Sequence, residues 1–307
     1  MSLPFDAALA GKLIPLYALV VIGFLLGRVV KVRSHEIGAL ALYVLSPAVV
    51  FKGFHGARLD GALAVLPLAV FGLACLVAWL SLPLAAGFWR DGRERIAAFA
   101  AATGNTGFFG IPACLVLLGP DSLPAAVMIS FGFTAYENTV GYFTVARAEA
   151  TVAGALMRVL RYPGLHACWL GVTLNLLDVR LPAFVPQTVD LLAGGFSAVG
   201  MMIVGLGLAQ VARPRPDLGF LGFAFAWKFL FWPLVAVAFV WVDRTFLQSF
   251  SPIAHQVMLV QSLAPMAAVT VVHATLRNVH PDRAAVAVAA STLFALVWLP
   301  LVHALAA

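Results

Sequence analysis

The chain has 307 residues, of which 63% are hydrophobic and only 10% are charged, and its formal net charge is +6. A soluble domain carries about 25% charged residues, so this composition excludes an ordinary soluble protein and predicts a chain that crosses a membrane many times. The basic residues stand singly or in small groups between apolar stretches, without the clustered basic face of a nucleic-acid-binding protein. We therefore expect a lipid bilayer as the environment and no nucleic acid as a partner.

A membrane-spanning helix needs about 20 apolar residues, and the chain holds ten such stretches joined by short connections. This pattern predicts an all-α membrane protein with ten transmembrane helices and no inserted soluble domain. It contains no GxxxxGK[ST] phosphate-binding loop either, which excludes a nucleotide-driven pump on its own. The expected spans are 12–30, 36–55, 61–88, 95–118, 122–146, 160–177, 187–211, 218–242, 253–276 and 283–305.

Basic residues predict the orientation in the membrane. Thirteen Lys and Arg lie in loops that follow odd-numbered spans, whereas five lie on the opposite side. Because cytoplasmic loops carry the excess of Lys and Arg, the odd-numbered loops should be cytoplasmic. We expect a multi-pass protein of the inner or plasma membrane with both termini outside, in the periplasm.

Ten spans divide into two halves of five, which we place at residues 1–150 and 151–307. An odd number of spans gives the two halves opposite orientations. The pattern therefore predicts an inverted repeat, which is typical of secondary transporters.

Two spans contain residues that interrupt a helix at corresponding places in the halves. The fourth span holds "GNTGFFGIPA", with Gly104, Gly107 and Pro112, and the ninth holds Pro265 in "VQSLAPMAAVTVVHA". Glycine permits unwound backbone and proline removes a donor, so both spans should be broken. The freed polar groups must line a protein-buried or watery cavity, and each half-helix N-terminus offers N–H groups to an anion. A pair of such breaks predicts a transport site.

Polar residues in or near the breaks are the candidates for substrate binding. Asn105 and Thr106 lead, because they offer side-chain hydrogen bonds beside unwound backbone. Gln261 and Ser262 stand before the second break. The full predicted substrate site comprises Asn105, Thr106, Gly104, Gly107, Pro112, Pro265, Ser262, Gln261, Asn138 and Ser46.

Three ionisable residues lie within spans, where they are costly and functional by default. Glu137 in span five could bind and release a coupling proton, and Lys228 in span eight could complement an anionic substrate. Alternatively, both have a structural role: they neutralise each other, or Glu137 pairs with a broken-helix N-terminus and Lys228 caps a broken-helix C-terminus. His273 in span nine is a further candidate for proton coupling, with a hydrogen-bonded helix residue as the alternative.

The spans lack the residues that an intramembrane enzyme needs. There is no HExxH, no aspartate pair and no CxxC, and the three cysteines lie in separate apolar segments. We predict no enzymatic activity, no metal and no cofactor.

The fourth-span stretch "GNTGFFGIPACLVLLG" resembles the signature of the auxin efflux carrier family of bacterial and plant transporters. Four further stretches are similar to that family: "LYVLSPAVVFKGF", "WKFLFWPLV", "QSLAPMAAVTVVHA" and "AAVAVAASTLFALVWLP". The chain departs from the family pattern at Met266, where a second small residue or proline is frequent. It also lacks the long central loop of the plant members, and so resembles the short bacterial branch, often linked with malonate or other dicarboxylates.

The resemblance implies the fold of the bile-acid sodium symporters, with broken helices in spans four and nine that cross beside the substrate. Spans 1, 2, 6 and 7 would form a scaffold domain, and spans 3–5 and 8–10 a transport domain that moves like an elevator. The function that follows is a secondary transporter or facilitator for a small organic anion, a mono- or dicarboxylate. An anion channel or a membrane receptor on the same fold is the alternative. Substrate, direction, coupling by a proton and oligomeric state, including a homodimer, stay open.

Overall fold

The computed structural model describes residues 7–306 except 33, 57–60, 147–152, 154–156, 158–159, 211–215 and 277. All regular elements within these ranges are helical. Seven helical stretches among them are long and apolar enough to cross a membrane: Leu13–Val30, Ile37–His55, Gly61–Phe88, Arg93–Leu118, Phe184–Ala209, Leu218–Leu247 and Pro281–Val302. The predicted class of helical membrane protein is confirmed, and the count of ten spans stays a prediction.

The three other expected spans coincide with helices that are short or interrupted. Span five corresponds to α7 (Leu123–Asn138) and α8 (Val140–Ala146), and span six to α10 (Pro163–Leu176). Span nine corresponds to α14 (Pro252–Ser262) and α15 (Val269–Leu276).

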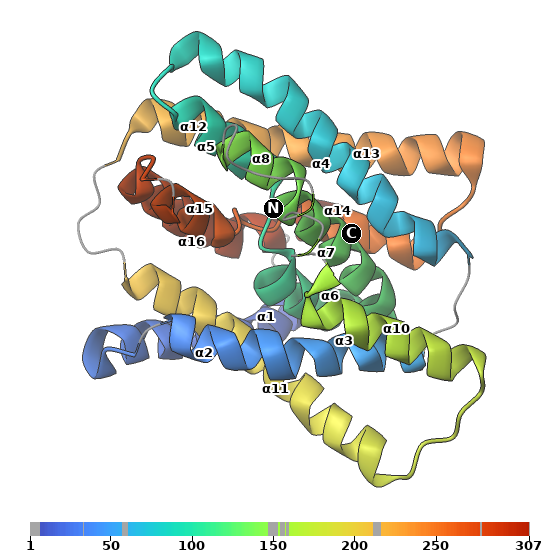
Figure 1. Cartoon of the computed structure of the whole chain (residues 1–307). Coiled ribbons are helices and arrows are strands. Elements are labelled where there is room, and N and C mark those ends of the chain that lie inside the picture. The colour runs from blue at the N-terminus through green and yellow to red at the C-terminus, as the bar shows by residue number, and fades with distance from the viewer. Residues whose placement is uncertain are drawn as a thin grey trace.

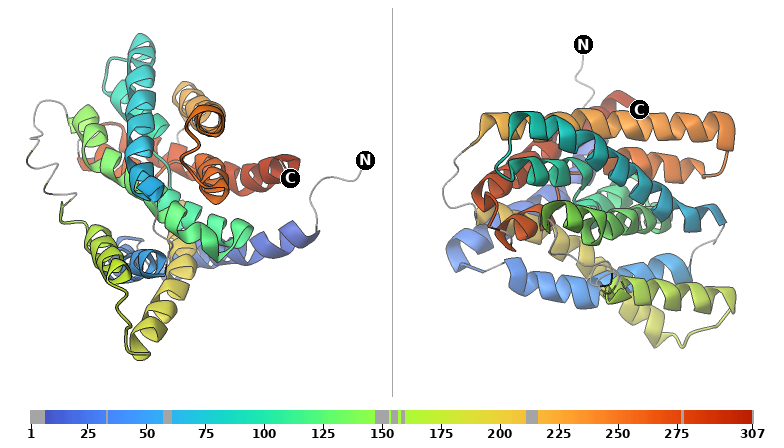
Figure 2. Two further views of the ribbon diagram at one scale, coloured as in Figure 1. Left: turned by 90° about the vertical axis from the view of Figure 1, so that its right-hand side faces the viewer. Right: turned by 45° about the horizontal axis from the view of Figure 1, so that its top comes forward.

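One group of helices packs around α11 (Phe184–Ala209). It contains α10, and α1 (Ala7–Leu25) with η1 (Leu26–Val30). It also contains α2 (Ser34–Leu40), η2 (Ala41–Leu45) and α3 (Ser46–His55), which follow one another as one helix with a π-helical turn. The helix α1 packs on α11, and α3 packs on both α10 and α11. Figures 1 and 2 show α3, α10 and α11 together on one side of the molecule.

The second group holds the remaining elements, with α4 packed on both α5 and α7. Its members through α8 are α4 (Gly61–Phe88), α5 (Arg93–Ala102), η3 (Thr106–Gly110), α6 (Ile111–Leu118), η4 (Pro120–Ser122), α7 and α8. Its later members are α12 (Leu218–Phe225), η6 (Ala226–Phe231), α13 (Trp232–Val242), η7 (Asp243–Leu247), α14, α15 and α16 (Pro281–Ala306). In Figure 1, α4, α12 and α13 lie on the side opposite to α3 and α11.

Local sequence signals explain where several of these helices begin. The Asp217 carboxylate caps α12 by accepting from the Phe220 N–H at 3.1 Å, and the Ser251 hydroxyl caps α14 by accepting from Ala254 at 3.3 Å. A proline stands in the first turn of α7, α10 and α14, where its missing N–H has no helical partner to lose.

The expected boundary between the two halves, at residues 150 and 151, lies outside the described residues. The assignment of spans to a scaffold and a transport domain and the inverted repeat stay proposals.

Candidate functional site

The fourth span is interrupted at three residues. The helix α5 ends at Ala102, Thr103 is extended with φ −114° and ψ 168°, and Asn105 has φ −73° and ψ 61°. The chain then re-enters a helix as the π-helical turn η3, which continues into α6. No side chain caps the start of η3. The break therefore leaves backbone polar groups in the middle of a span, as the glycines in this stretch predict.

The position of the break corrects the role expected of Pro112. This proline lies in the first turn of α6, directly after η3, so the chain around it is helical and the unwound residues are 103–105. Proline has no N–H to donate, and it is tolerated there because the wider π-helical turn before it offers no regular helical acceptor at that position. Gly104 lies in the break itself, whereas Gly107 lies within η3.

The ninth span is interrupted around Pro265, as expected. The helix α14 ends at Ser262 and α15 begins at Val269. Within the intervening segment, the Met266 N–H donates to the Ser291 hydroxyl at 3.1 Å. A polar side chain of α16 thus replaces a helical partner for one freed backbone group.

The two breaks touch each other. The Asn105 N–H donates to the Pro265 carbonyl over 2.7 Å, and the Thr106 N–H donates to Gly104 within the first break. On the far side of η3, the Gln261 side chain packs against Gly110 and donates to the Ala126 carbonyl at 3.0 Å. The structure therefore brings five predicted site residues to one crossing, namely Gly104, Asn105, Thr106, Gln261 and Pro265.

The amino group of Lys228 lies directly behind this crossing. Lys228 is fully buried, and a Cβ added at Gly104 would lie 2.6 Å from its Nζ. The Nζ atom faces the rings of Phe133 at 5.7 Å and Trp232 at 5.5 Å. It has no hydrogen-bond acceptor among the described residues. A side chain at position 104 would therefore require the lysine side chain to move.

The carboxylate of Glu137 reaches the same break from α7. It accepts a hydrogen bond from the hydroxyl of Thr103. The charges of Glu137 and Lys228 interact across the break, although these two described side chains form no direct ion pair. A carboxylate and an ammonium group thus flank the unwound segment.

The remaining predicted site residues lie elsewhere or bond locally. Ser46 begins α3 in the other helix group, the Ser262 hydroxyl donates to Leu259 at 2.7 Å, and the Asn138 amide donates to Thr134 at 2.8 Å. The His273 ring is buried against Phe99, with ring centres 4.9 Å apart.

A cavity of about 940 Å³ opens between the two helix groups. Val49 and Lys52 of α3 and Ala193 of α11 line one wall, and Leu115 of α6 and Ala125 of α7 line another. None of the crossing residues lines it. Its lining residue Ala125 precedes Ala126 in the chain, and the Ala126 carbonyl accepts the hydrogen bond from Gln261.

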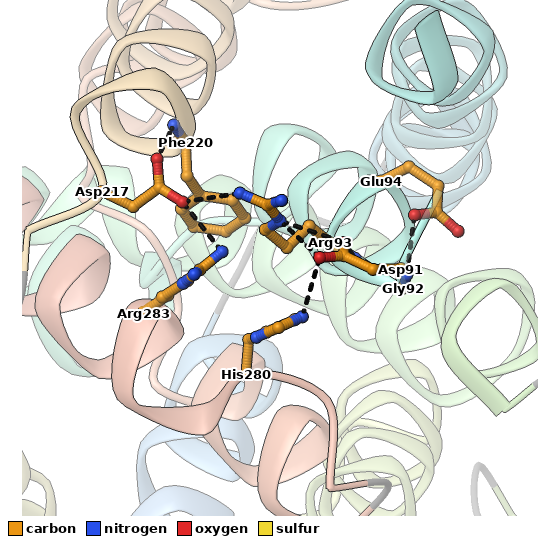
Figure 3. A network of polar contacts seen from close by, with 8 residues as sticks. All are labelled: Asp91, Gly92, Arg93, Glu94, Asp217, Phe220, His280 and Arg283. Atoms are coloured by element: carbon orange, nitrogen blue, oxygen red, sulfur yellow. Dashed lines mark hydrogen bonds and ion pairs between the residues drawn. The ribbon is translucent and has the colours of Figure 1, made fainter. Parts of the chain in front are cut away.

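A polar network that the sequence analysis missed joins three chain segments at the predicted cytoplasmic side (Figure 3). Arg93 contacts Asp91 at 3.0 Å and Asp217 at 2.9 Å, while Arg283 contacts Asp217 at 2.9 Å and His280 contacts Asp91 at 3.4 Å. These residues lie at or directly before the starts of three helices, α5, α12 and α16. The charged stretches "RDGRER" and "PDR" were the available signal, but a sequence does not show that they meet.

The network determines the charge of its two carboxyl groups. The hydrogen bond from the Arg93 side chain holds the pKa of Asp91 at about 2, below its ordinary value. Burial alone would raise the pKa of Asp217, but hydrogen bonds from Phe220 and Arg93 hold it below the ordinary value. Both groups therefore stay charged near neutral pH and fix the ends of three helices.

Comparison with known proteins identifies the family. The profile of the family described as "Membrane transport protein" matches residues 150–303. The chain belongs to this family. The resemblance to the auxin efflux carriers, which rested on motifs of both halves, is confirmed.

Proteins that are named transporters align over most of this chain. An uncharacterized transporter of Methanothermobacter thermautotrophicus is 24% identical over 92% of this chain and 93% of its own length. A protein of Rhizobium meliloti named "Putative malonate transporter" is 24% identical over 70% of this chain and 72% of its own length. The chain is thus a membrane transporter and not an enzyme.

Proposed function

We propose that the protein is a secondary transporter or facilitator for a small organic anion with a carboxylate group. The observation that carries this proposal is the contact between Asn105 and Pro265, which joins two broken helices at one point. Beside it, the uncapped start of η3 presents N–H groups with a positive helix end. A Cβ added at Gly107 would meet no described atom of a neighbouring segment within 4 Å, so space is open next to these groups.

Electrostatics supports an anion of low charge. Lys228 supplies a buried positive charge behind the break, and Glu137 supplies a negative one. A substrate carboxylate at the start of η3 would be attracted by the ammonium group and by the helix end. If Glu137 is protonated, its negative charge is lost and the remaining local charge, that of Lys228, attracts an anion more strongly. This gives a physical basis for coupling transport to a proton. In this proposal His273 is a second proton-accepting group.

The packing of the helices supports an elevator movement. Helices assigned to the scaffold pack mainly on one another, as α1 does on α11 and α3 does on α10. These two contacts correspond under an inverted repeat, since they join span one to seven and span six to two. The π-helical turn η3 meets α11 across the boundary between the groups. A transport group could therefore slide along α11 while it carries the crossing.

Counterflow in proteoliposomes tests the proposal. Vesicles are loaded with unlabelled malonate, other mono- and dicarboxylates or indole-type acids, and the entry of labelled malonate is followed with and without a pH gradient. We expect internal malonate to drive accumulation of the label, because a carrier exchanges substrate through one alternating site. The name of the Rhizobium meliloti relative makes malonate the first probe.

Three results are informative in this experiment. Exchange with another carboxylate alone would keep the mechanism and replace the substrate. Flux that does not saturate and shows no counterflow would favour a channel. A complete absence of flux would contradict the proposed function.

A further inference from the structure

The cavity between the helix groups carries charged residues that the crossing does not use. Three charged side chains line it: Lys52 on α3, Asp190 on α11 and Asp121 on η4. The cavity lies at the side of the loops after even-numbered spans, which is the predicted outer side. Among the described lining residues, Lys52 is the single cation. An anion in the cavity therefore meets one positive group among these described residues.

Lys52 is engaged by an intramolecular carboxylate. Its Nζ lies 2.8 Å from Asp190 Oδ1, and the two side chains are 47% and 59% exposed. An ion pair in water of this kind is weak, because solvent and salt screen it and both side chains lose freedom when it forms. A carboxylate from solution can therefore exchange with Asp190 at little cost.

The surroundings of the pair suit a carboxylate with a small body. The walls next to Lys52 are formed by Val49 and Gly53 of α3 and by Ala193 and Gly194 of α11, which leave the ammonium group accessible. From there the cavity extends to Leu115 of α6 and Ala125 of α7, on the wall formed by the other helix group.

We propose that Lys52 is an outer binding site for the carboxylate of the incoming substrate and that Asp190 is its intramolecular competitor. This inference rests on the proposed function, since it assigns the first contact of the same transported anion. Asp190 forms an ion pair with the Lys52 ammonium group when the cavity is empty, and this ion pair opens when a substrate carboxylate binds Lys52. The exchange raises the local concentration of the anion in the cavity between the two helix groups.

The two members of the pair should have opposite effects on transport. In proteoliposomes with labelled malonate outside, we expect Lys52→Met to raise KM by about two- to fivefold and Asp190→Asn to lower KM by a similar factor. Both effects should shrink at high salt, because the pair is exposed. Arg180→Met is the matched control, since this exposed cation is on the same predicted side but does not line the cavity, and its KM should not change.

A structural role for the ion pair gives a different result. Either substitution would then remove the same interaction, so both KM values would move in one direction or stay unchanged, and this outcome overturns the inference. If the unsubstituted protein transports no carboxylate, the proposed function fails. The inference is then tested by carboxylate binding alone. For this test, Ser197, which also lines the cavity, is replaced by cysteine in a variant that lacks the native cysteines.

That cysteine is modified with a negatively charged thiol reagent in the presence of malonate. We expect malonate to protect it in the Asp190→Asn background and not in the Lys52→Met background. Equal protection in both backgrounds overturns the inference.

Discussion

At the residue scale, the buried charge of Lys228 is the most demanding feature of the protein. An unpaired ammonium group away from water is costly, and here the compensation comes from two aromatic faces and from the charge of Glu137. The Thr103 hydroxyl, freed by the helix break, holds the carboxylate. The break therefore provides the polar group that keeps this pair of charges in place.

Replacing Glu137 by glutamine tests whether it carries the coupling proton. We expect Glu137→Gln to flatten the dependence of counterflow on pH between about 5 and 8, because the amide cannot titrate. Asp91→Asn is the control. The pKa of Asp91 is about 2, so this carboxylate is charged throughout the window. The stability that the Asp91 carboxylate contributes is lost only as pH falls below the ordinary pKa of an aspartate. An unchanged pH profile in Glu137→Gln would make this carboxylate structural.

The side chain of Asn105 is expected to contact the substrate. Asn105→Ala should reduce counterflow to background while purified yield stays normal, because the contact to Pro265 uses the backbone N–H, which alanine keeps. Asn138→Ala is the matched variant, since that amide already bonds Thr134 within α7, and it should retain most activity. Normal counterflow in Asn105→Ala would remove the fourth-span break from the site.

At the scale of elements, the crossing of α1 and α11 depends on the absence of side chains. A Cβ added at Gly205 would lie 1.9 Å from the Val20 carbonyl, and one added at Gly23 would lie 2.1 Å from the Met202 carbonyl. Small residues let backbones approach closely, which is how helices associate inside a membrane. The GxxxG spacing of Gly23 and Gly27 reflects this packing.

Alanine substitutions in α11 separate packing from helix propensity. We expect Gly205→Ala to destabilise the protein by about 1–3 kcal/mol or more, because the backbone atoms of α1 cannot move away from the new methyl group. Gly207→Ala in the same helix meets no described atom within 4 Å and should be neutral or stabilising by up to about 1 kcal/mol. Thermal unfolding in detergent measures both; equal melting temperatures would contradict the close crossing.

At the scale of the whole molecule, the proposed elevator requires the two helix groups to slide past each other. Phe108 of η3 and Gly200 of α11 face each other across the boundary, where a Cβ at Gly200 would lie 3.4 Å from the Phe108 Cα. A disulfide needs Cβ atoms about 3.5–4.5 Å apart, and the close approach of these two segments makes positions 108 and 200 candidates for a pair of cysteines. We expect this disulfide to stop counterflow, and reduction to restore it.

A disulfide inside one helix group is the control for this experiment. Gly171 of α10 and Phe54 of α3 approach similarly, with a Cβ at Gly171 3.1 Å from the Phe54 Cβ. This bridge should leave transport intact, because both helices belong to the proposed scaffold. Counterflow that continues through the locked Phe108–Gly200 pair would contradict a sliding movement.

The sequence alone determined the membrane class, the family and the existence of two broken spans. Apolar length, loop charge and helix-breaking residues are local properties, and each can be seen without knowing what a residue contacts. The exact position of the break was less predictable. The sequence pattern placed it at Pro112, yet the chain unwinds at Thr103–Asn105, where the Asn105 N–H donates to the Pro265 carbonyl and Lys228 lies next to Gly104.

Only the tertiary structure decided which distant residues act together. The contact between Asn105 and Pro265, the position of Lys228 against Gly104 and the pairing of Lys52 with Asp190 all join segments far apart in the chain. The charged network around Arg93 was invisible for the same reason. Sequence patterns record which face of a helix is apolar, but packing between helices sets which polar groups meet, and that depends on the whole fold.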